Sequence, residues 1–534
     1  MTEVPMGCVE SWAARILAAV LVALLPAGAR AQSLTMGVQS GFTLDPHYLF
    51  LGPNMAAARH LYEALVGRDA ESRWVPGLAL SWAAVDDTTW EFRLRPGVTF
   101  HDGTPFTAAD VVASFARVPS VPNNPGPYTS NLRTITRIEV VDPHTIRIHT
   151  DSPNPVLPGQ LTNIFILPAA IAATASTGDF STGRAAIGTG PFRLEASRGS
   201  DGMVLRRYPG WWGGAVAWDK VDVRVVPNDA SRLASVLAGD LDLTEEVPTT
   251  DLARLARDPR VAVFHRPSDR VMFLLPNVGA ERLPLLTDPT GQPLPSNPLR
   301  DLRVRRAISL SINRTALAER ALDGFAFATG QLVPEGFVGA DPAMLPDPYD
   351  PAQARRLLAE AGFPQGLGLT VGCSNNRYVN DGRVCQALGQ MLSRGGFQAK
   401  VEAQPGTVFF PRTQAERNDV PVILFGLSLS STRDVQHLLA TVLHSRNREL
   451  GLGIGNRGSF TDAELDHMIE AAMVRMDPGR EEALREAMRR GVSLLGAIPL
   501  YNQVTIAVAR RGITYTPRMD EQLVAFQARP ENAP

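Results

Sequence analysis

Few residues of this chain have the types and spacing that enzyme or metal chemistry requires. The sequence contains no Gly-x-Ser-x-Gly nucleophile elbow and no His-Glu-x-x-His zinc pair, and its nine histidines are scattered. His437 and His444 are seven positions apart and could share one face of a helix, but no carboxylate completes a set of metal ligands. Because catalytic triads assemble from distant positions, a secreted hydrolase stays as an alternative. The residues favour a protein that is not an enzyme and has no resident metal or cofactor.

Three further patterns carry chemistry without deciding a function. Cys373 and Cys385 lie twelve positions apart and lack the spacing and histidine partners of a zinc site. A disulfide between them and two free buried thiols both remain open. The glycine-rich run Gly451–Gly455 has no strand–helix context and no following lysine, so we do not expect it to bind nucleotide phosphates. Trp211 and Trp212 could stack on a sugar or a base, although the adjacent glycines favour packing inside the protein.

Length and charge limit the remaining classes. A chain of 534 residues is too long for one compact core, so two or three domains are expected. Apolar residues make up 44% and charged residues 20%, which is ordinary for a globular protein. The net charge of −2 gives no general attraction to nucleic acid or to anionic lipid.

The first 31 residues predict an export signal rather than a folded element. Arg15 precedes an apolar run from Ile16 to Leu25, Pro26 then interrupts it, and Ala29-Arg30-Ala31 places small residues at −3 and −1 of a cleavage site. A run of about ten apolar residues is too short to span a bilayer. We therefore expect cleavage near Ala31 and a periplasmic mature protein.

Two hairpins are expected near the start of the mature chain. Trp90–Arg95 alternates apolar and charged residues, and the Pro96-Gly97 turn predicts that it pairs with Val98–Phe100. A second hairpin is predicted from Ile135–Val141 and Thr145–His149.

Helix signals complete the elements. Thr107 and Asp110 predict the start of one helix, and Asp350 predicts the start of another. Strand and helix patterns then alternate between residues 369 and 425, which indicates α/β layers.

Eight segments in order resemble one family and cover nearly the whole mature chain. They resemble the family-5 extracellular solute-binding proteins, the periplasmic dipeptide, oligopeptide and nickel receptors of ABC importers. The segments are Tyr62–Val66, Pro76–Ala79, Ser81-Trp82, Phe92–Val111, Gly188–Phe192, Trp212–Gly214, Asp301–Ile308 and Tyr349–Phe363. Each has a plain structural explanation as a turn, a cap or a bend, so together they indicate the scaffold rather than the cargo.

The resemblance implies an α/β fold of a known kind. This fold is the type II periplasmic-binding-protein clamp of the large peptide-binding type, with two lobes, an extra subdomain and two crossover hinge strands. Residues 32–267 with 505–534 would form lobe I, including an extra subdomain at about 50–185, and residues 268–504 would form lobe II. The chain would cross near His265–Met272 and return near Leu500–Thr505. A ligand would shift an existing balance between open and closed lobes.

The resemblance also implies a function and partners. The chain would be the extracytoplasmic solute-binding component of an ABC importer, capturing a small peptide or peptide-like molecule and delivering it to the permease subunits as a monomer. A non-peptide cargo stays open, namely an anionic amino-acid conjugate, a nickel chelate or haem, and so does a sensory role.

Peptide-binding members of the family hold the ligand amine with an acidic residue and the ligand carboxylate with arginine. The cleft segments of lobe II would be 374–381 and 425–434. The first resembles an Asn-Asp-Arg-Tyr-Val-Asn-Asp run of one family branch, but Asn376 stands where that run has a carboxylate. In the second, Leu427 replaces a tryptophan, and Asp434 is the one acidic residue left. These departures favour a less cationic or an anionic ligand anchored by Arg377 and Arg433.

Nine residues are expected to contact the ligand. They are Ser40, Asn376, Arg377, Tyr378, Ser428, Ser430, Arg433, Asp434 and Tyr501. Purely structural alternatives stay open for four of them: Arg433 and Asp434 as a solvated pair, Arg377 in a salt bridge, and Tyr501 in a buried hinge strand.

Overall fold

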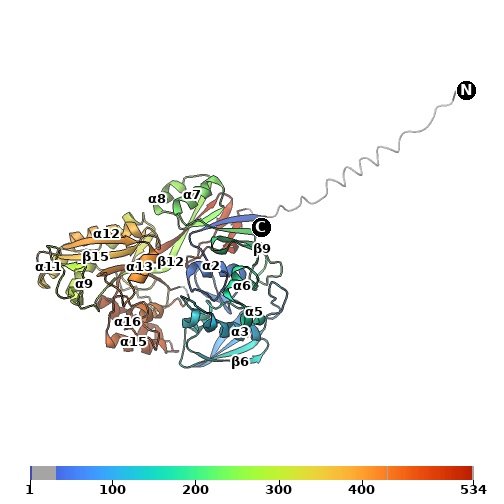
Figure 1. Cartoon of the computed structure of the whole chain (residues 1–534), viewed down its shortest axis with the longest axis horizontal. Helices are drawn as coiled ribbons and strands as arrows, with labels where there is room; N and C mark the ends of the chain where they lie inside the picture. Colours follow the sequence, from blue (N-terminus) through green and yellow to red (C-terminus); the bar gives the residue numbers. More distant parts are fainter. Residues whose placement is uncertain (3–31, 430, 532–534) are drawn as a thin grey trace.

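The computed structural model describes residues 1–2, 32–429 and 431–531. The predicted export signal falls almost wholly outside the described residues. The folded part has two lobes that meet at two long antiparallel strands, β12 (Val261–Pro276) and β18 (Ile498–Arg510) (Figure 1). Among the described residues, no helix has the length and apolar character to cross a membrane.

One twelve-stranded sheet runs through both lobes because β12 and β18 belong to each of them. In the first lobe, β18 is followed by five more strands of this sheet, among which β1 pairs in parallel with both of its neighbours. Its order is β11 (Leu243–Glu245), β1 (Ser33–Val38), β10 (Lys220–Val225), β9 (Gly202–Arg207) and β8 (Phe192–Ser197). On the other side, β12 pairs with β17 (Val422–Ser428), which leads to β15 (Leu367–Ser374), β16 (Phe397–Gln404) and β13 (Leu286–Thr287), while β14 (Ala326–Ala328) pairs with β18.

The sheet changes lobes where the register of the two long strands breaks. Residues Val261–Pro267 of β12 pair with the end of β18, whereas Arg270–Pro276 pair with β17, and the register shifts between Pro267 and Val271. Three consecutive polar residues, Ser268, Asp269 and Arg270, occupy this break and are all buried. The crossover strands expected from the resemblance are therefore present.

The first lobe carries a separate four-stranded antiparallel sheet. Its order is β4 (Ala79–Asp86), β5 (Thr89–Leu94), β7 (Thr145–Thr150) and β6 (Ile135–Asp142). It has its own apolar core, to which α3 (Ala108–Arg117) contributes Val111 and Phe115. The β6–β7 hairpin is present as predicted. The helix also begins at Thr107 as predicted, and the Thr107 N–H donates to Asp110 Oδ2 at 2.8 Å.

The other predicted hairpin is wrong. Trp90–Arg95 corresponds to β5, but β5 pairs with β4 and β7 rather than with Val98–Phe100. Thr99 instead forms an isolated bridge with Pro105, and the Phe100 and Phe106 rings pack edge to face in the core. The Pro96-Gly97 turn therefore closes a short loop and not a hairpin.

Helices cover both faces of the second lobe's sheet. Strand β15 is buried along all eight residues, as expected for a strand with parallel neighbours and helices on both sides. One core contains Ile308, Leu358 and Leu388, and the other contains Ile469 and Met488. The helices of this lobe are α9 (Leu302–Leu310), α10 (Arg314–Ala316), α11 (Pro351–Glu360), α12 (Asp381–Arg394), α13 (Gly406–Arg412), α14 (Gln436–Leu438), α15 (Ala463–Met473) and α16 (Arg480–Ser493). Asp350 caps α11 as predicted, accepting from the Gln353 N–H at 2.8 Å.

The smaller helices of the first lobe support its sheets. They are α2 (Gly52–Leu61), α4 (Leu157–Leu161), α5 (Ala169–Thr174), α6 (Thr177–Ser181), α7 (Asp229–Ala238) and α8 (Thr249–Leu255). Glu63, which follows α2, accepts hydrogen bonds from both indole N–H groups of Trp211 and Trp212, at 3.0 and 2.7 Å. The Arg95 guanidinium covers the Trp212 ring at 3.7 Å. The tryptophan pair is therefore packed inside the protein, as the sequence favoured.

The C-terminal segment is fastened to α2 through His60. His60 Nδ1 lies 2.9 Å from the Ala56 carbonyl oxygen and must donate to it, so Nε2 is the acceptor for the Ala525 N–H at 2.9 Å. A cationic imidazole would lose that acceptor. Burial accordingly lowers the pKa of His60 to about 4.

This neutral imidazole predicts a pH dependence of stability. Because the unfolded chain binds the His60 proton below about pH 6.5 and the folded chain does so only near pH 4, the free energy of unfolding should fall as pH drops through this interval. His60→Gln should reduce the slope of unfolding free energy against pH by the amount that corresponds to about one bound proton. Urea unfolding between pH 4 and 7 measures the slope. Equal slopes for the two proteins would contradict the assignment.

Candidate ligand-binding cleft

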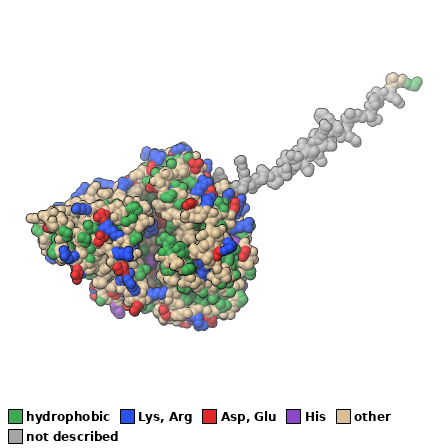
Figure 2. Space-filling view, in the orientation of Figure 1, with side chains coloured by type: hydrophobic (Ala, Val, Ile, Leu, Met, Phe, Trp, Pro, Cys, Tyr) green, Lys and Arg blue, Asp and Glu red, His purple; other side chains and the backbone are tan. Residues whose placement is uncertain are grey.

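The two lobes enclose one large cavity of about 1320 Å³. Figure 2 shows the hollow where the lobes face each other. The wall from the first lobe includes Phe50, Arg68, Asn131, Ile135, Gln160 and Asn163, and the wall from the second includes Arg377, Tyr378, Phe410, Phe425, Ser428, His437 and Arg457. Arg270 of β12 lies at the hinge end, with Asp520 and Gln522 of the C-terminal segment.

The lobes also touch each other around this cavity. The indole N–H of Trp74, in β3 (Trp74–Pro76) of the first lobe, donates to the Ser431 carbonyl oxygen at 2.9 Å. Arg133 donates to the Glu449 carbonyl oxygen, and the side chain of Asn380 donates to Thr249 Oγ1. These contacts place the protein in a closed arrangement, in which the cavity is bounded by both lobes.

A buried ion pair occupies the hinge end. The Arg270 guanidinium binds Glu521 through Nε and Nη2, at 2.9 and 2.6 Å from Oε2. Glu521 also accepts from Ser268 Oγ at 2.7 Å and from Gln503 Nε2 at 2.8 Å. Ser268 and Gln503 belong to β12 and β18, so one carboxylate from the C-terminal segment joins both crossover strands. Burial raises the pKa of Glu521, but Arg270 more than offsets this, and the pKa lies below its usual value.

A second buried carboxylate links the two lobes beside this pair. Asp269 accepts from Ser428 Oγ of the second lobe at 2.6 Å and from Ser72 Oγ of the first lobe at 3.3 Å. Burial raises the pKa of Asp269 to about 7. Both hydroxyls can donate to it, so Asp269 has partners from both lobes.

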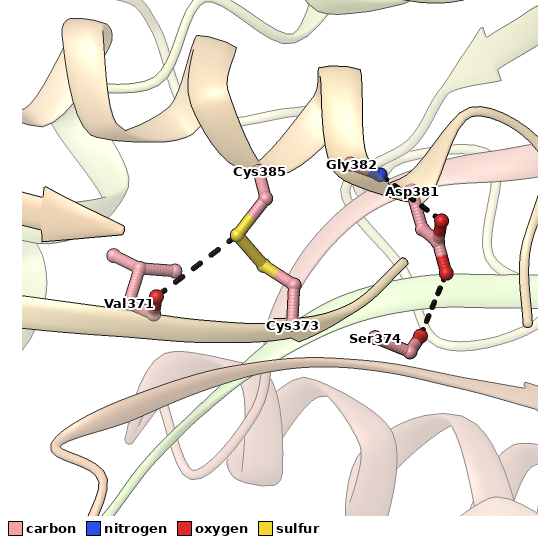
Figure 3. The surroundings of a disulfide bond; sticks show 6 residues. All are labelled: Val371, Cys373, Ser374, Asp381, Gly382 and Cys385. Carbon is pink, nitrogen blue, oxygen red and sulfur yellow. Dashed lines mark hydrogen bonds between the residues drawn. A yellow bond between two sulfur atoms is a disulfide. The ribbon is translucent and has the colours of Figure 1, made fainter. Parts of the chain in front are cut away.

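The loop that carries Arg377 and Tyr378 is held at both ends. Cys373 at the end of β15 and Cys385 in α12 form a disulfide, with their Cα atoms 6.2 Å apart. Figure 3 shows Asp381 to one side of the disulfide, where Ser374 Oγ donates to Asp381 Oδ2 at 2.7 Å. The N–H groups of Arg377 and Tyr378 donate to the same oxygen at 3.0 and 3.2 Å. The disulfide resolves the alternatives that the sequence left open.

Removing this disulfide should destabilise the second lobe. Closing a loop of this length reduces the conformational entropy of the unfolded chain, and we expect the Cys373→Ser/Cys385→Ser protein to lose about 2–3 kcal/mol of unfolding free energy. Guanidinium unfolding without reductant measures the loss. Dithiothreitol should lower the midpoint of the native protein only. A double variant as stable as the native protein would show that the bond adds nothing to stability.

Tyr378 is the centre of an aromatic and cationic wall. Its hydroxyl lies 3.1 Å from the Gly426 N–H, which donates to it, and its ring packs edge to face on Phe410. The Arg377 guanidinium lies 5.4 Å from the Tyr378 ring centre, and the Arg457 guanidinium lies 5.6 Å from that of Phe410. Two cations thus flank two adjoining rings on one side of the cavity.

These two cations differ from Arg270 in lacking a direct ion pair to any residue that the structure describes, although the charge of Arg377 opposes the effect of burial on the pKa of Glu246 and of Glu521. Within the described part of the chain, the Arg377 guanidinium has no hydrogen-bond or ion-pair partner, and its side chain is exposed. Arg457 donates to the Phe410 carbonyl oxygen at 2.8 Å and to Thr413 Oγ1 at 2.9 Å, and burial lowers its pKa. No ion pair of Arg457 occurs among the described residues. The wall therefore presents positive charge to the cavity.

Three of the nine predicted contact residues line this cavity. They are Arg377, Tyr378 and Ser428. Ser40 is exposed after β1 and lies outside the cavity, and the exposed Asn376 accepts from the Gly406 N–H at 2.8 Å. Ser430 lies outside the described residues.

The other three predicted residues have partners within the second lobe or its core. Asp434 is buried and binds Arg480 at 2.6 Å, so its carboxylate does not reach the cavity. The Arg433 guanidinium lies over the Phe337 ring at 4.7 Å. Tyr501 belongs to β18 and is fully buried in the core of the second lobe.

Sequence reasoning missed Arg270, Glu521 and Arg457. A signal existed for Arg270, since Ser268-Asp269-Arg270 interrupts an otherwise apolar strand. Nothing in the sequence pattern indicates that Arg457 lines the cleft or that Glu521 binds Arg270, because both residues come from loops distant in sequence.

The comparisons with known proteins agree with this geometry. Residues 73–449 match the family described as bacterial extracellular solute-binding proteins, family 5 middle. The chain belongs to this family. The resemblance inferred from the sequence is thereby confirmed, and this family-5 protein is the solute-binding component of an ABC importer, acting outside the cytoplasm.

Curated and solved relatives support the same placement. The glutathione-binding protein GsiB of Salmonella typhi is 31% identical over 484 residues, which is 89% of each chain. The periplasmic binding protein DppA of Helicobacter pylori, solved with the peptide STSA, has a TM-score of 0.77 at 20% identity and covers 94% of this chain and 99% of its own. NikZ of Campylobacter jejuni, solved with Ni(L-His), also scores 0.77 at 19% identity, covering 93% and 99%. These neighbours establish the type II periplasmic-binding-protein fold of the family-5 kind, and the relatives are binding proteins rather than enzymes.

Proposed function

We propose that this family-5 protein captures an anionic, peptide-like molecule in the closed cleft and delivers it to its permease. The observation that carries the proposal is the pair of guanidinium groups, Arg377 and Arg457, that line the cavity and have no direct ion pair in the described chain. Glutathione is the first candidate of this class, because the curated relative named for it is 31% identical over 89% of the chain.

The chemistry of the wall suits carboxylates. Arginine binds a carboxylate through two parallel N–H groups, and such charge-assisted bonds are stronger than neutral ones. Arg377 is free to do this, whereas Arg270 is already engaged by Glu521. The Tyr378 and Phe410 rings restrict the side-chain conformations of Arg377 and Arg457. The two arginines therefore lose less conformational entropy when they bind a ligand carboxylate.

The proposal also covers the lobe boundaries, the export of the protein and its oligomeric state. Residues 32–267 with 505–534 would move as one lobe, with the extra subdomain at 50–185, and residues 268–504 as the other. The register break in β12 between Pro267 and Val271 supports a hinge there. We also propose that the export signal is removed near Ala31, that the mature periplasmic protein acts as a monomer, and that it has no catalytic activity.

Mass spectrometry of small molecules released by denaturing the protein from its host would identify the cargo directly. A thermal-shift screen of glutathione, acidic tripeptides and lysine-containing tripeptides tests its charge. We expect the anionic compounds to raise the melting temperature, since a ligand that binds only the folded state stabilises it. If only cationic peptides raised it, the proposal would be wrong.

A further inference from the structure

The cavity has an apolar part that an anionic head group would leave empty. Leu51, Ile135, Ile138, Leu450, Ile454 and Val474 all line it. Ile135 and Ile138 belong to β6, and Val474 follows α15. Figure 1 shows β6 and α15 on the side of the molecule away from α7 and α8, which pack on the crossover strands. The elements that carry Ile135, Ile138 and Val474 therefore lie on the opposite side of the molecule from α7 and α8.

These side chains are unusually exposed for their type. Ile454 is 62% exposed, Leu51 51%, Leu450 47% and Val474 43%. Single exposed hydrophobic residues need no explanation, but four that line one cavity indicate a binding surface. Contact with an apolar group would remove this surface from water.

Both lobes contribute to the apolar part. The Arg133 guanidinium of the first lobe donates to the Glu449 carbonyl oxygen, which brings the 448–454 loop of the second lobe against the start of β6. An apolar group held there would touch both lobes. It would therefore add contacts that exist only when the lobes are closed.

The size of the cavity points the same way. At about 1320 Å³ it exceeds the range of about 300–1,000 Å³ that is usual for a pocket filled by one small molecule. A short peptide bound at Arg377 and Arg457 would occupy only the cationic part. The rest of the lining combines the six apolar side chains with charged neighbours such as Arg448 and Glu470, so it could hold an apolar group beside polar ones.

We infer that the cargo is an amphipathic conjugate, an anionic peptide-like head carrying a bulky apolar substituent. The head lies at Arg377 and Arg457, and the substituent lies among Ile454, Val474 and the β6 isoleucines. For a glutathione-type head, the alkyl group that an S-alkyl derivative carries on its sulfur is such a substituent. This inference rests on the proposed function and narrows its substrate class.

Calorimetric titration of the purified protein with glutathione, S-methylglutathione and S-hexylglutathione tests the inference. We expect S-hexylglutathione to bind at least tenfold more tightly than glutathione, and S-methylglutathione to bind like glutathione. Ile454→Asn/Val474→Asn should remove most of the gain from the hexyl chain and leave glutathione binding within about twofold. Leu345→Asn is a matched control, because Leu345 is 76% exposed and lies outside the cavity.

The outcomes separate the two proposals. If glutathione binds but the hexyl chain adds nothing, or if its gain survives in the double variant, the amphipathic cargo is wrong and the anionic cargo stands. If none of the three compounds binds, a glutathione-type head is wrong, and the inference falls with it.

Discussion

Replacing Arg377 with glutamate is expected to weaken binding of an anionic peptide-like ligand at least a hundredfold. A hydrogen bond to a charged group contributes about 1.5–3 kcal/mol, and the reversed charge adds repulsion to the loss. The fold should be retained with a small loss of stability, because the Arg377 side chain is exposed and makes no hydrogen bond in the described chain, but its charge acts on Glu246 and Glu521. Calorimetric titration with glutathione, alongside urea unfolding, measures both effects. The affinity of Arg377→Ala should lie between those of the native protein and Arg377→Glu, with a loss of about tenfold.

Arg394→Glu is the matched control for this charge reversal. Arg394 is exposed on α12 of the same lobe, outside the cavity, and its replacement changes the net charge equally. Equal losses for the two variants would show that general electrostatics, and not contact at Arg377, governs affinity. Unchanged binding by Arg377→Glu would remove this residue from the site.

Motifs that fix backbone geometry made the fold predictable. Thr107, Asp350 and the short turn between Ile135–Val141 and Thr145–His149 act on their immediate neighbours, and each forms the element that its local pattern predicts. The hairpin at Pro96-Gly97 was wrong because strand pairing is not local. Residues Thr145–His149, some fifty positions later, take the place beside β5 that Val98–Phe100 was expected to hold.

The site was less predictable because charge partners are set by the tertiary structure. Arg377 and Tyr378, which line the cavity, were selected because residues 374–381 resemble an Asn-Asp-Arg-Tyr-Val-Asn-Asp run of one family branch. Sequence reasoning also selected Asp434, whose carboxylate is used by Arg480, forty-six positions away in α16. No local pattern distinguishes a carboxylate engaged by a distant arginine from one that faces a cavity. Glu521 was missed for the same reason, because its partner Arg270 is distant in sequence.

The disulfide and Asp381 explain why this loop can carry a binding residue. A long exposed arginine loses conformational freedom when it binds a ligand, and that cost falls if its backbone is already fixed. Here the Arg377 N–H donates to Asp381, and Cys373 and Cys385 close the loop on either side. Rigidity of the support and freedom of the guanidinium together suit a site that must release its cargo to a permease.

Glu521→Ala is expected to destabilise the protein by about 3–5 kcal/mol, the cost of leaving a buried arginine without its partner. Arg270 is only 7% exposed, and Glu521 provides its two strongest bonds while also holding Ser268 and Gln503. The loss should therefore be concentrated at the crossover strands, where amide hydrogen exchange in β12 and β18 should rise most. Guanidinium unfolding measures the total.

Two further variants show whether the charge or the shape of this pair matters. Arg270→Met/Glu521→Leu removes both charges and keeps apolar volume, and it should recover most of the stability lost by Glu521→Ala. Glu531→Ala, at an exposed position of the same C-terminal segment, should have little effect. The double variant should nevertheless lose the polar links from one carboxylate to both crossover strands, so its lobes should populate the open form more often in solution scattering without ligand. If Glu521→Ala unfolds like the native protein, the pair is not the element that joins the hinge.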